Sequence, residues 1–169
     1  MPYIGDIVVE LELWGSSADD ICFGPGEQVL FSSRLKAAFE SSQLKGTGFQ
    51  FAKVSKVKSH KKGRPDIPSY YLTSIGRSQA IVDPIASGME WESKVDCEEC
   101  HLDGILKRFR RIVLVPDTWS GEDIFFARGL PGTIITSQRF QETIVSIGLT
   151  AELLIPINEF SIDLYPWEK

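Results

Sequence analysis

Apolar and polar side chains alternate along residues 7–13 of the chain. Every second position is apolar, namely Ile7, Val9, Leu11 and Leu13, and glutamates occupy two of the positions between them. A period of two places successive side chains on opposite faces of an extended backbone, so we expect a half-buried strand here. Gly15 ends the alternation, and Gly24-Pro25-Gly26 predicts a turn.

A helical period of apolar positions appears at two places. The first stripe contains Leu35, Ala38 and Phe39, and the second contains Phe140, Ile144 and Ile147. Ser32 or Ser33 suits the N-cap of the first helix, because a hydroxyl accepts a bond from an unpaired backbone N–H. Thr136 or Ser137 suits the second, and Gly148 lies where a helix C-terminus favours a left-handed residue.

The two predicted helices belong to an internal repeat. Residues 32–44 align without a gap on residues 137–149. Serine, arginine and leucine recur at identical offsets, in the pairs Ser32/Ser137, Arg34/Arg139, Ser41/Ser146 and Leu44/Leu149. Upstream, Trp14 with Asp20 corresponds to Trp119 with Asp123. Each copy lies between two apolar stretches, so we expect two pseudo-repeated strand–helix–strand units, over about residues 7–57 and 116–165.

Residues 58–115 lie between the two units and contain short strand signals. We expect strands at 70–72, 80–82 and 89–95, and a buried strand over the apolar run 112–115. A last strand is expected over 153–157, either at a sheet edge or with a bulge, because Pro156 lacks a backbone donor. Two helices among many strands predict the α+β class with a mainly antiparallel β middle region. No linker divides the chain, which favours a single domain over residues 1–169.

Charge and composition narrow the classes of function. The 169 residues carry a formal net charge of −5, which disfavours a general nucleic-acid binder and favours a basic partner. No apolar run approaches the ~20 residues that a membrane span needs, so no membrane partner is expected. Three cysteines, an odd number, fit a reducing compartment, and residues 1–6 lack the basic start of a signal peptide. We therefore expect a cytoplasmic protein.

Residues 97–101, Cys-Glu-Glu-Cys-His, form the one segment whose pattern indicates metal chemistry. Cys97 and Cys100 would present two thiolates to a structural zinc ion, which needs two further ligands. The candidates are His60, His101 and Cys22, although His101 directly follows Cys100. If the set stays incomplete, the two cysteines are ordinary thiols and the protein has no cofactor, which is the interpretation we favour. The segment also matches the haem-attachment pattern, but that chemistry requires export.

Two basic clusters, at residues 53–64 and 107–111, provide an alternative function, a zinc-knuckle protein that binds nucleic acid. No aromatic residue lies within the first cluster, so a solvated hairpin explains it better. A catalytic site is not expected, because the two histidines lie in no nucleophile motif and no phosphate-binding glycine loop occurs. We therefore expect neither an enzyme nor a small-molecule binder.

Residues 119–126 combine a glycine turn with an aromatic strand. Asp123 lies at the junction between them, where a carboxylate is suited to accept hydrogen bonds that tie the turn. The aromatic side chains of this segment are expected in the core.

Several of these segments together resemble a known family. They are Tyr70-Tyr71-Leu72, the Cys97–Cys100 knuckle, the Trp119–Phe126 segment, Ile134-Ile135-Thr136-Ser137-Gln138-Arg139-Phe140 and Gly148-Leu149-Thr150. In this order they resemble the double-CxxCG-motif immunity proteins of bacterial polymorphic toxin systems, and related immunity families. The resemblance covers about residues 70–157, and residues 28–54 match the first copy of the same signature. The family carries two knuckles, whereas this chain has one, with His101 in place of glycine.

The resemblance implies a non-enzymatic cytoplasmic immunity protein that binds and neutralises one cognate toxin domain. Toxins that attack nucleic acids are often basic around their clefts, so an acidic binder gains association rate and specificity from charge complementarity. We therefore hypothesise that the acidic region 90–103, which also contains an aromatic of the type enriched at interfaces, contributes to the toxin contact. The alternative is that this region is a solvated acidic hairpin. The candidate contact residues are Glu90, Trp91, Glu92, Asp96, Glu98 and Glu99.

Overall fold

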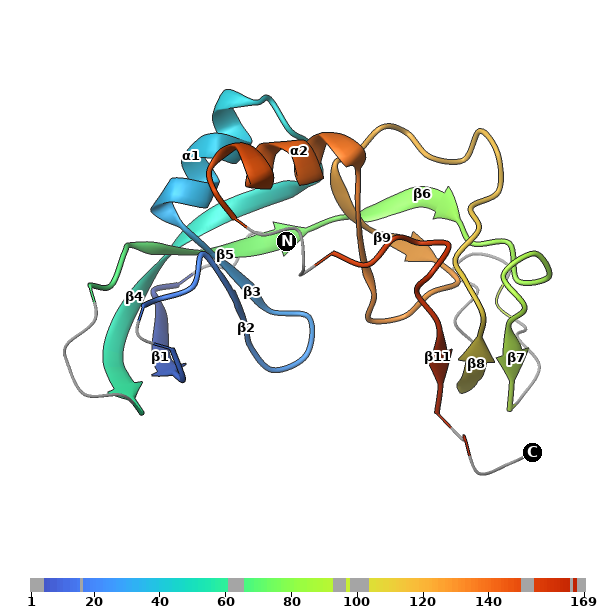
Figure 1. The fold of residues 1–169 in the computed structure, drawn as a ribbon, viewed down its shortest axis with the longest axis horizontal. Coiled ribbons are helices and arrows are strands. Elements are labelled where there is room, and N and C mark those ends of the chain that lie inside the picture. Colours follow the sequence, from blue (N-terminus) through green and yellow to red (C-terminus); the bar gives the residue numbers. More distant parts are fainter. Residues whose placement is uncertain are drawn as a thin grey trace.

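The computed structural model describes residues 5–15, 17–60, 66–92, 97, 104–149, 154–164 and 166. The described residues form an α+β fold with two helices, as the sequence predicted, and their strands lie in three sheets. Figure 1 shows the two helices side by side, with the strands below them. No helix among the described residues is long and apolar enough to cross a membrane.

The first sheet has five strands in the order β1-β4-β5-β3-β2. Their bounds are β1 Ile7–Leu13, β2 Ile21–Phe23, β3 Val29–Ser32, β4 Thr47–Ser59 and β5 Tyr70–Ile75. The alternating segment is β1, as predicted, and it pairs in parallel with β4. The other pairs in this sheet are antiparallel. β1 and β2 therefore form the two edges of the sheet.

Two three-stranded sheets make up the rest of the fold. The second has the order β10-β9-β6, with β6 Arg77–Ile81, β9 Ile124–Arg128 and β10 Ile134–Thr136. The third has the order β11-β8-β7, with β7 Glu90–Trp91, β8 Leu106–Phe109 and β11 Ile162–Asp163. Both sheets combine strands that are distant in the sequence.

Two helices, α1 Ser33–Ser41 and α2 Gln138–Ser146, begin at serine N-caps. The Ser32 hydroxyl accepts a bond from Leu35 N at 3.1 Å, and the Ser137 hydroxyl accepts one from Phe140 N at 3.2 Å. The predicted caps are thereby confirmed, with Ser32 and Ser137 as the residues used. Gly148 has φ +77° directly after α2, as its position predicted.

The main core lies between the helix pair and the five-stranded sheet. Leu35 and Ile144 are fully buried there, and the apolar stripes of both helices meet β3. Phe31 lies 6.1 Å from Phe140 and 6.4 Å from Phe39 between ring centroids. A second core fills the space between the other two sheets, and a third lies on the far face of the first sheet. The five-stranded sheet therefore has apolar side chains on both faces.

Two predicted strands do not form. Residues 112–115 make backbone bonds to two separate segments: Ile112 N donates to Ile157 O, whereas Asp83 N donates to Val113 O and Val115 N donates to Ile81 O. With its bonds divided in this way, the run joins no ladder and carries only the isolated bridge Val82–Leu114. The described part of the other segment, 154–157, is also not a strand. The second predicted strand–helix–strand unit is therefore not completed within the described residues.

The strands predicted between the two helices do not form a β region of their own. β5 joins the first sheet, β6 pairs in parallel with β9, and β7 pairs with β8 in the third sheet. The sequence predicted the existence of these short strands but not their partners, because pairing depends on contacts between distant segments.

Candidate functional site

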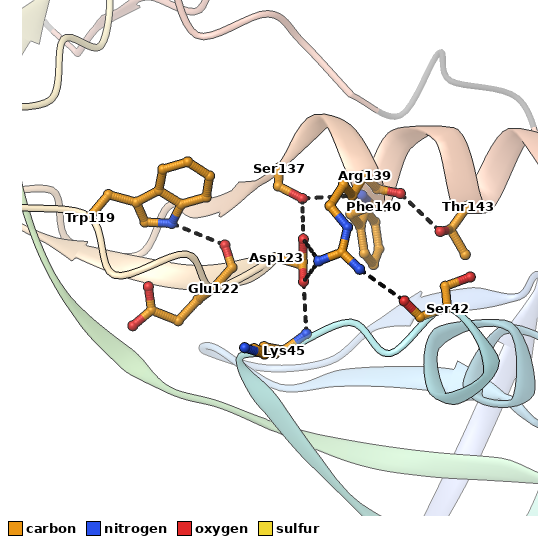
Figure 2. A network of polar contacts seen from close by, with 9 residues as sticks. All are labelled: Ser42, Lys45, Trp119, Glu122, Asp123, Ser137, Arg139, Phe140 and Thr143. Atoms are coloured by element: carbon orange, nitrogen blue, oxygen red, sulfur yellow. Dashed lines mark hydrogen bonds and ion pairs between the residues drawn. The ribbon is translucent and has the colours of Figure 1, made fainter.

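The signature segment 119–126 is organised around the carboxylate of Asp123, which is only 1% exposed (Figure 2). Ser137 Oγ donates to Oδ1 at 2.6 Å, the backbone N–H of Lys45 donates to Oδ2 at 2.9 Å, and Arg139 Nη1 lies 3.2 Å from Oδ2. These donors satisfy a buried charge. Asp123 therefore ties the turn to α2 and to the α1–β4 connection, the structural role that the sequence predicted.

Asp20 makes the corresponding contacts in the first copy. Ser32 Oγ donates to its Oδ1, and the guanidinium of Arg34 forms an ion pair with the carboxylate. Burial alone would raise the pKa of Asp20, but the hydrogen bonds from Arg34 and Ser32 outweigh it and hold that pKa below its ordinary value. Ser32 N donates to Asp20 O and Ser137 N to Asp123 O, at 2.9 and 3.0 Å.

The two arginines join the copies reciprocally. Arg34 Nη1 donates to the carbonyl of Ile147, the C-cap of α2, and Arg139 Nη2 donates to the carbonyl of Ser42, the C-cap of α1, each at 3.0 Å. Carbonyls at a helix C-terminus lack intrahelical partners, and a cation there is favourable. The repeated Ser and Arg positions thus hold two helices together, and their polar groups are engaged in these contacts.

The hairpins that precede the helices also have the same register. Ile21 pairs with Phe31 in the first hairpin, and Ile124 pairs with Thr136 in the second, each immediately after the anchoring aspartate. Each aspartate therefore precedes a hairpin followed by a helix, β2-β3-α1 after Asp20 and β9-β10-α2 after Asp123.

The predicted zinc ligands are not brought together among the residues that the structure describes. His60 directly follows β4. Its ring stacks on Trp14 with 4.0 Å between ring centroids, and its Nε2 lies 2.6 Å from Glu12 Oε1. Cys97 is half-buried against β6 and β9 of the second sheet. In the described ranges no three His, Cys, Asp or Glu side chains are placed to hold a metal. Cys100 and His101 lie outside those ranges.

The predicted acidic contact region is described in part. Glu90 is in β7, where its Oε2 lies 3.1 Å from Arg108 Nε. Trp91 is half-buried and Glu92 is exposed. Asp96, Glu98 and Glu99 lie outside the described residues. The charge of Glu90 is therefore compensated by Arg108, which lies near Asp163 as well.

Several cations of the basic clusters are engaged in ion pairs. Parallel pairing of β1 with β4 places Lys56 beside Glu10 and Lys58 beside Glu12, with N–O distances of 3.8 and 2.7 Å. In the second cluster Arg108 contacts Glu90. These pairs reduce the positive potential that nucleic-acid binding would require.

One concave surface was not predicted from the sequence. A groove of about 910 Å³ lies on the face of the first sheet opposite the helices, between the edge strands β1 and β2. Apolar side chains of β1, β2, β3 and β5 line it, and Trp14 and Phe23 at its walls are each 71% exposed. We call this surface the β1–β2 groove and define it by Trp14 and Phe23 at its walls and by Leu11, Leu30 and Leu72 among its apolar lining residues. The alternating pattern of β1 predicted the apolar face that forms one wall. The opposite wall comes from the β2–β3 hairpin, whose position relative to β1 depends on the strand order of the sheet, and the sequence did not predict that order.

The chain matches the model of the Imm11 immunity protein family over residues 21–157. No curated protein matches the chain. The matched range includes β2-β3-α1 and β9-β10-α2, and it confirms the resemblance to immunity proteins of toxin systems. Because the match covers most of the sequence, this chain belongs to the Imm11 immunity protein family.

Proposed function

We propose that this protein binds and neutralises a cognate bacterial toxin domain in the cytoplasm, and that it does so without catalysing a reaction. The observation that carries the proposal is the family match over residues 21–157. The arrangement of the signature residues supports it, because Ser137 and Arg139 both donate to Asp123 and thereby hold the turn against α2 as a scaffold. A scaffold of this kind presents a fixed surface to a partner.

Charge supports a basic partner. The net charge of −5 favours association with a domain that is positively charged around its nucleic-acid or nucleotide cleft. An acidic protein that covers such a cleft excludes an anionic substrate in two ways: it blocks the cleft sterically, and its negative electrostatic potential repels the substrate. Glu92 and the other acidic residues of the 90–99 segment remain proposed contributors to this contact.

The two hairpin–helix units are proposed to be a pseudo-repeat that serves as the frame of the molecule. Equal hairpin registers, equivalent aspartate anchors and reciprocal arginine contacts support this proposal. In this arrangement each unit completes the helix terminus of the other, so neither is expected to be stable alone.

Co-expression tests the proposed function directly. The gene adjacent to the one encoding this protein is expressed with and without it, and growth is measured. We expect the neighbouring product to arrest growth alone, and this protein to restore it. A catalytically inactive version of the neighbour should also copurify with this protein. A neighbour that is neither toxic nor bound would contradict the proposal.

A further inference from the structure

The β1–β2 groove has the composition of a protein docking site. Its floor consists of apolar side chains such as Leu30 and Leu72, and its two walls carry the exposed aromatics Trp14 and Phe23. In the described part of the chain these two are the most exposed Trp and Phe side chains. Exposed aromatics beside a concave apolar surface are typical of interaction sites, where a few aromatic anchors supply most of the binding energy.

The charges along the groove have one sign. Its charged lining residues are Asp6, Glu10, Glu12 and Asp19, and no Lys, Arg or His is among the described residues that line it. Glu10 and Glu12 pair with lysines of β4, whereas Asp6 and Asp19 are exposed and form no ion pair within the described ranges. The negative charge that no ion pair compensates therefore lies at the two aspartates, which line the same groove as the two aromatic side chains.

The apolar walls and the negative charges of the groove together favour some classes of ligand over others. Carboxylates repel phosphates, so a nucleotide or nucleic-acid segment is disfavoured. A groove of about 910 Å³ with open apolar walls has room for several side chains of a protein segment. Lysine or arginine side chains complement the aspartates and also contact aromatic faces favourably. The chemistry favours a polypeptide that carries both basic and apolar residues.

We infer that the β1–β2 groove is the docking surface for a basic segment of the toxin domain, whose apolar side chains pack between Trp14 and Phe23 while its cations approach Asp6 and Asp19. The inference rests on the proposed immunity function and names the surface through which it acts. It places the principal contact on the first sheet, away from the β7 region that the sequence suggested.

The test uses the purified, catalytically inactive toxin domain encoded by the adjacent gene. Its binding to the full chain is measured by calorimetry at low and at high salt. Trp14→Ala and Phe23→Ala should each raise the Kd at least tenfold, which is the size expected for interface anchors. The double variant Asp6→Lys/Asp19→Lys should also weaken binding and reduce its salt dependence. Thermal unfolding of each variant shows whether the fold is retained.

Matched controls lie elsewhere on the surface. Ile85→Ala truncates an apolar side chain that is 91% exposed in a turn, and Glu142→Lys/Glu159→Lys reverses two exposed charges. Both controls should leave the Kd within about twofold. If the natural chain binds and protects while the folded groove variants bind equally well, the groove is not the docking surface and the immunity function stands. If the natural chain neither binds nor protects, the function itself fails.

A second copy of this chain is the competing occupant. Sedimentation of the natural chain alone should show a monomer. A dimer that Trp14→Ala or Phe23→Ala dissociates would overturn the assignment to the toxin.

Discussion

At the scale of single residues, two aspartates anchor the molecule. Asp20 and Asp123 each accept a serine hydroxyl and a guanidinium, and each precedes a strand of its hairpin. Such charge-assisted bonds are strong when the acceptor is shielded from water. Stability should therefore depend on these carboxylates more than on the exposed ion pairs of β1 with β4, whose contributions are small.

Replacement of Asp123 tests this dependence. Asp123→Asn retains the shape of the side chain but removes the charge that Arg139 and Ser137 contact, so we expect a loss of about 2–3 kcal/mol in the free energy of unfolding. Urea denaturation measures it. Asp117→Asn is the control, because Asp117 is exposed at φ +62°, a conformation that asparagine accepts. Equal stabilities of the two variants would contradict the anchoring role.

The pH dependence of the free energy of unfolding should reflect the lowered pKa of Asp20. Its pKa is lower in the folded chain than the ordinary value of 3.8, so at acid pH the unfolded chain binds the proton first. This contribution to stability is present above the ordinary value and is lost as the pH falls through the folded pKa. The difference in unfolding free energy between the natural chain and Asp20→Asn should therefore shrink below about pH 4. Denaturation series at several acid pH values measure it, and a constant difference would refute the prediction.

Whether the chain binds zinc also depends on single residues, the predicted ligands. His60 is held by Glu12 and Trp14 on the first sheet, while Cys97 lies against the second. We therefore expect protein purified without chelator to contain well below one zinc per chain. We also expect the Cys97→Ser variant to unfold at the same temperature as the natural chain. Elemental analysis measures the first expectation. Stoichiometric zinc that Cys97→Ser removes would establish the site instead.

At the scale of elements, the helices are short and depend on their caps and on packing. Nine-residue helices such as α1 and α2 are marginal in isolation. Ser32 and Ser137 stabilise them by accepting a bond from the first turn while donating to an aspartate. Gly46 is required for another reason: with φ +112°, a Cβ there would lie 2.0 Å from the Ile124 carbonyl oxygen. The connection after α1 can therefore cross β9 only with glycine at this position.

The caps provide a matched pair of substitutions. Ser32→Ala should lower the free energy of unfolding by about 2 kcal/mol, because it removes both the cap and the bond to Asp20. Ser33→Ala, one residue later at an exposed position, should change it by less than about 0.5 kcal/mol. Chemical denaturation of both variants checks the difference. Comparable losses would place the cap at Ser33.

At the scale of the whole molecule, the helix pair joins the two hairpins and covers one face of the first sheet, so that the far face is not covered by a helix (Figure 1). The acidic residues of the chain differ in their surroundings. Glutamates of β1 pair with lysines of β4, whereas Asp6 and Asp19 line the groove and form no ion pair within the described residues. The same ion pairs argue against the alternative of a nucleic-acid binder.

Nucleic-acid binding should accordingly be absent. Neither single- nor double-stranded nucleic acid is expected to bind measurably at low salt, because Lys56, Lys58 and Arg108 are paired with carboxylates. Fluorescence anisotropy measures it. Binding that weakens steeply with added salt, and that Lys56→Ala reduces, would favour the alternative function.

The sequence by itself determined what depends on near neighbours: the alternation of β1, the two helical stripes, their serine caps, the left-handed Gly148 and the anchoring role of Asp123. These features follow from local periodicity and from hydrogen bonds that short segments require. Tertiary structure alone decided the partners of the middle strands, the diversion of residues 112–115 from a ladder, and the β1–β2 groove. Strand pairing and concavity depend on which distant segments meet, and a short strand satisfies its backbone equally well against many partners.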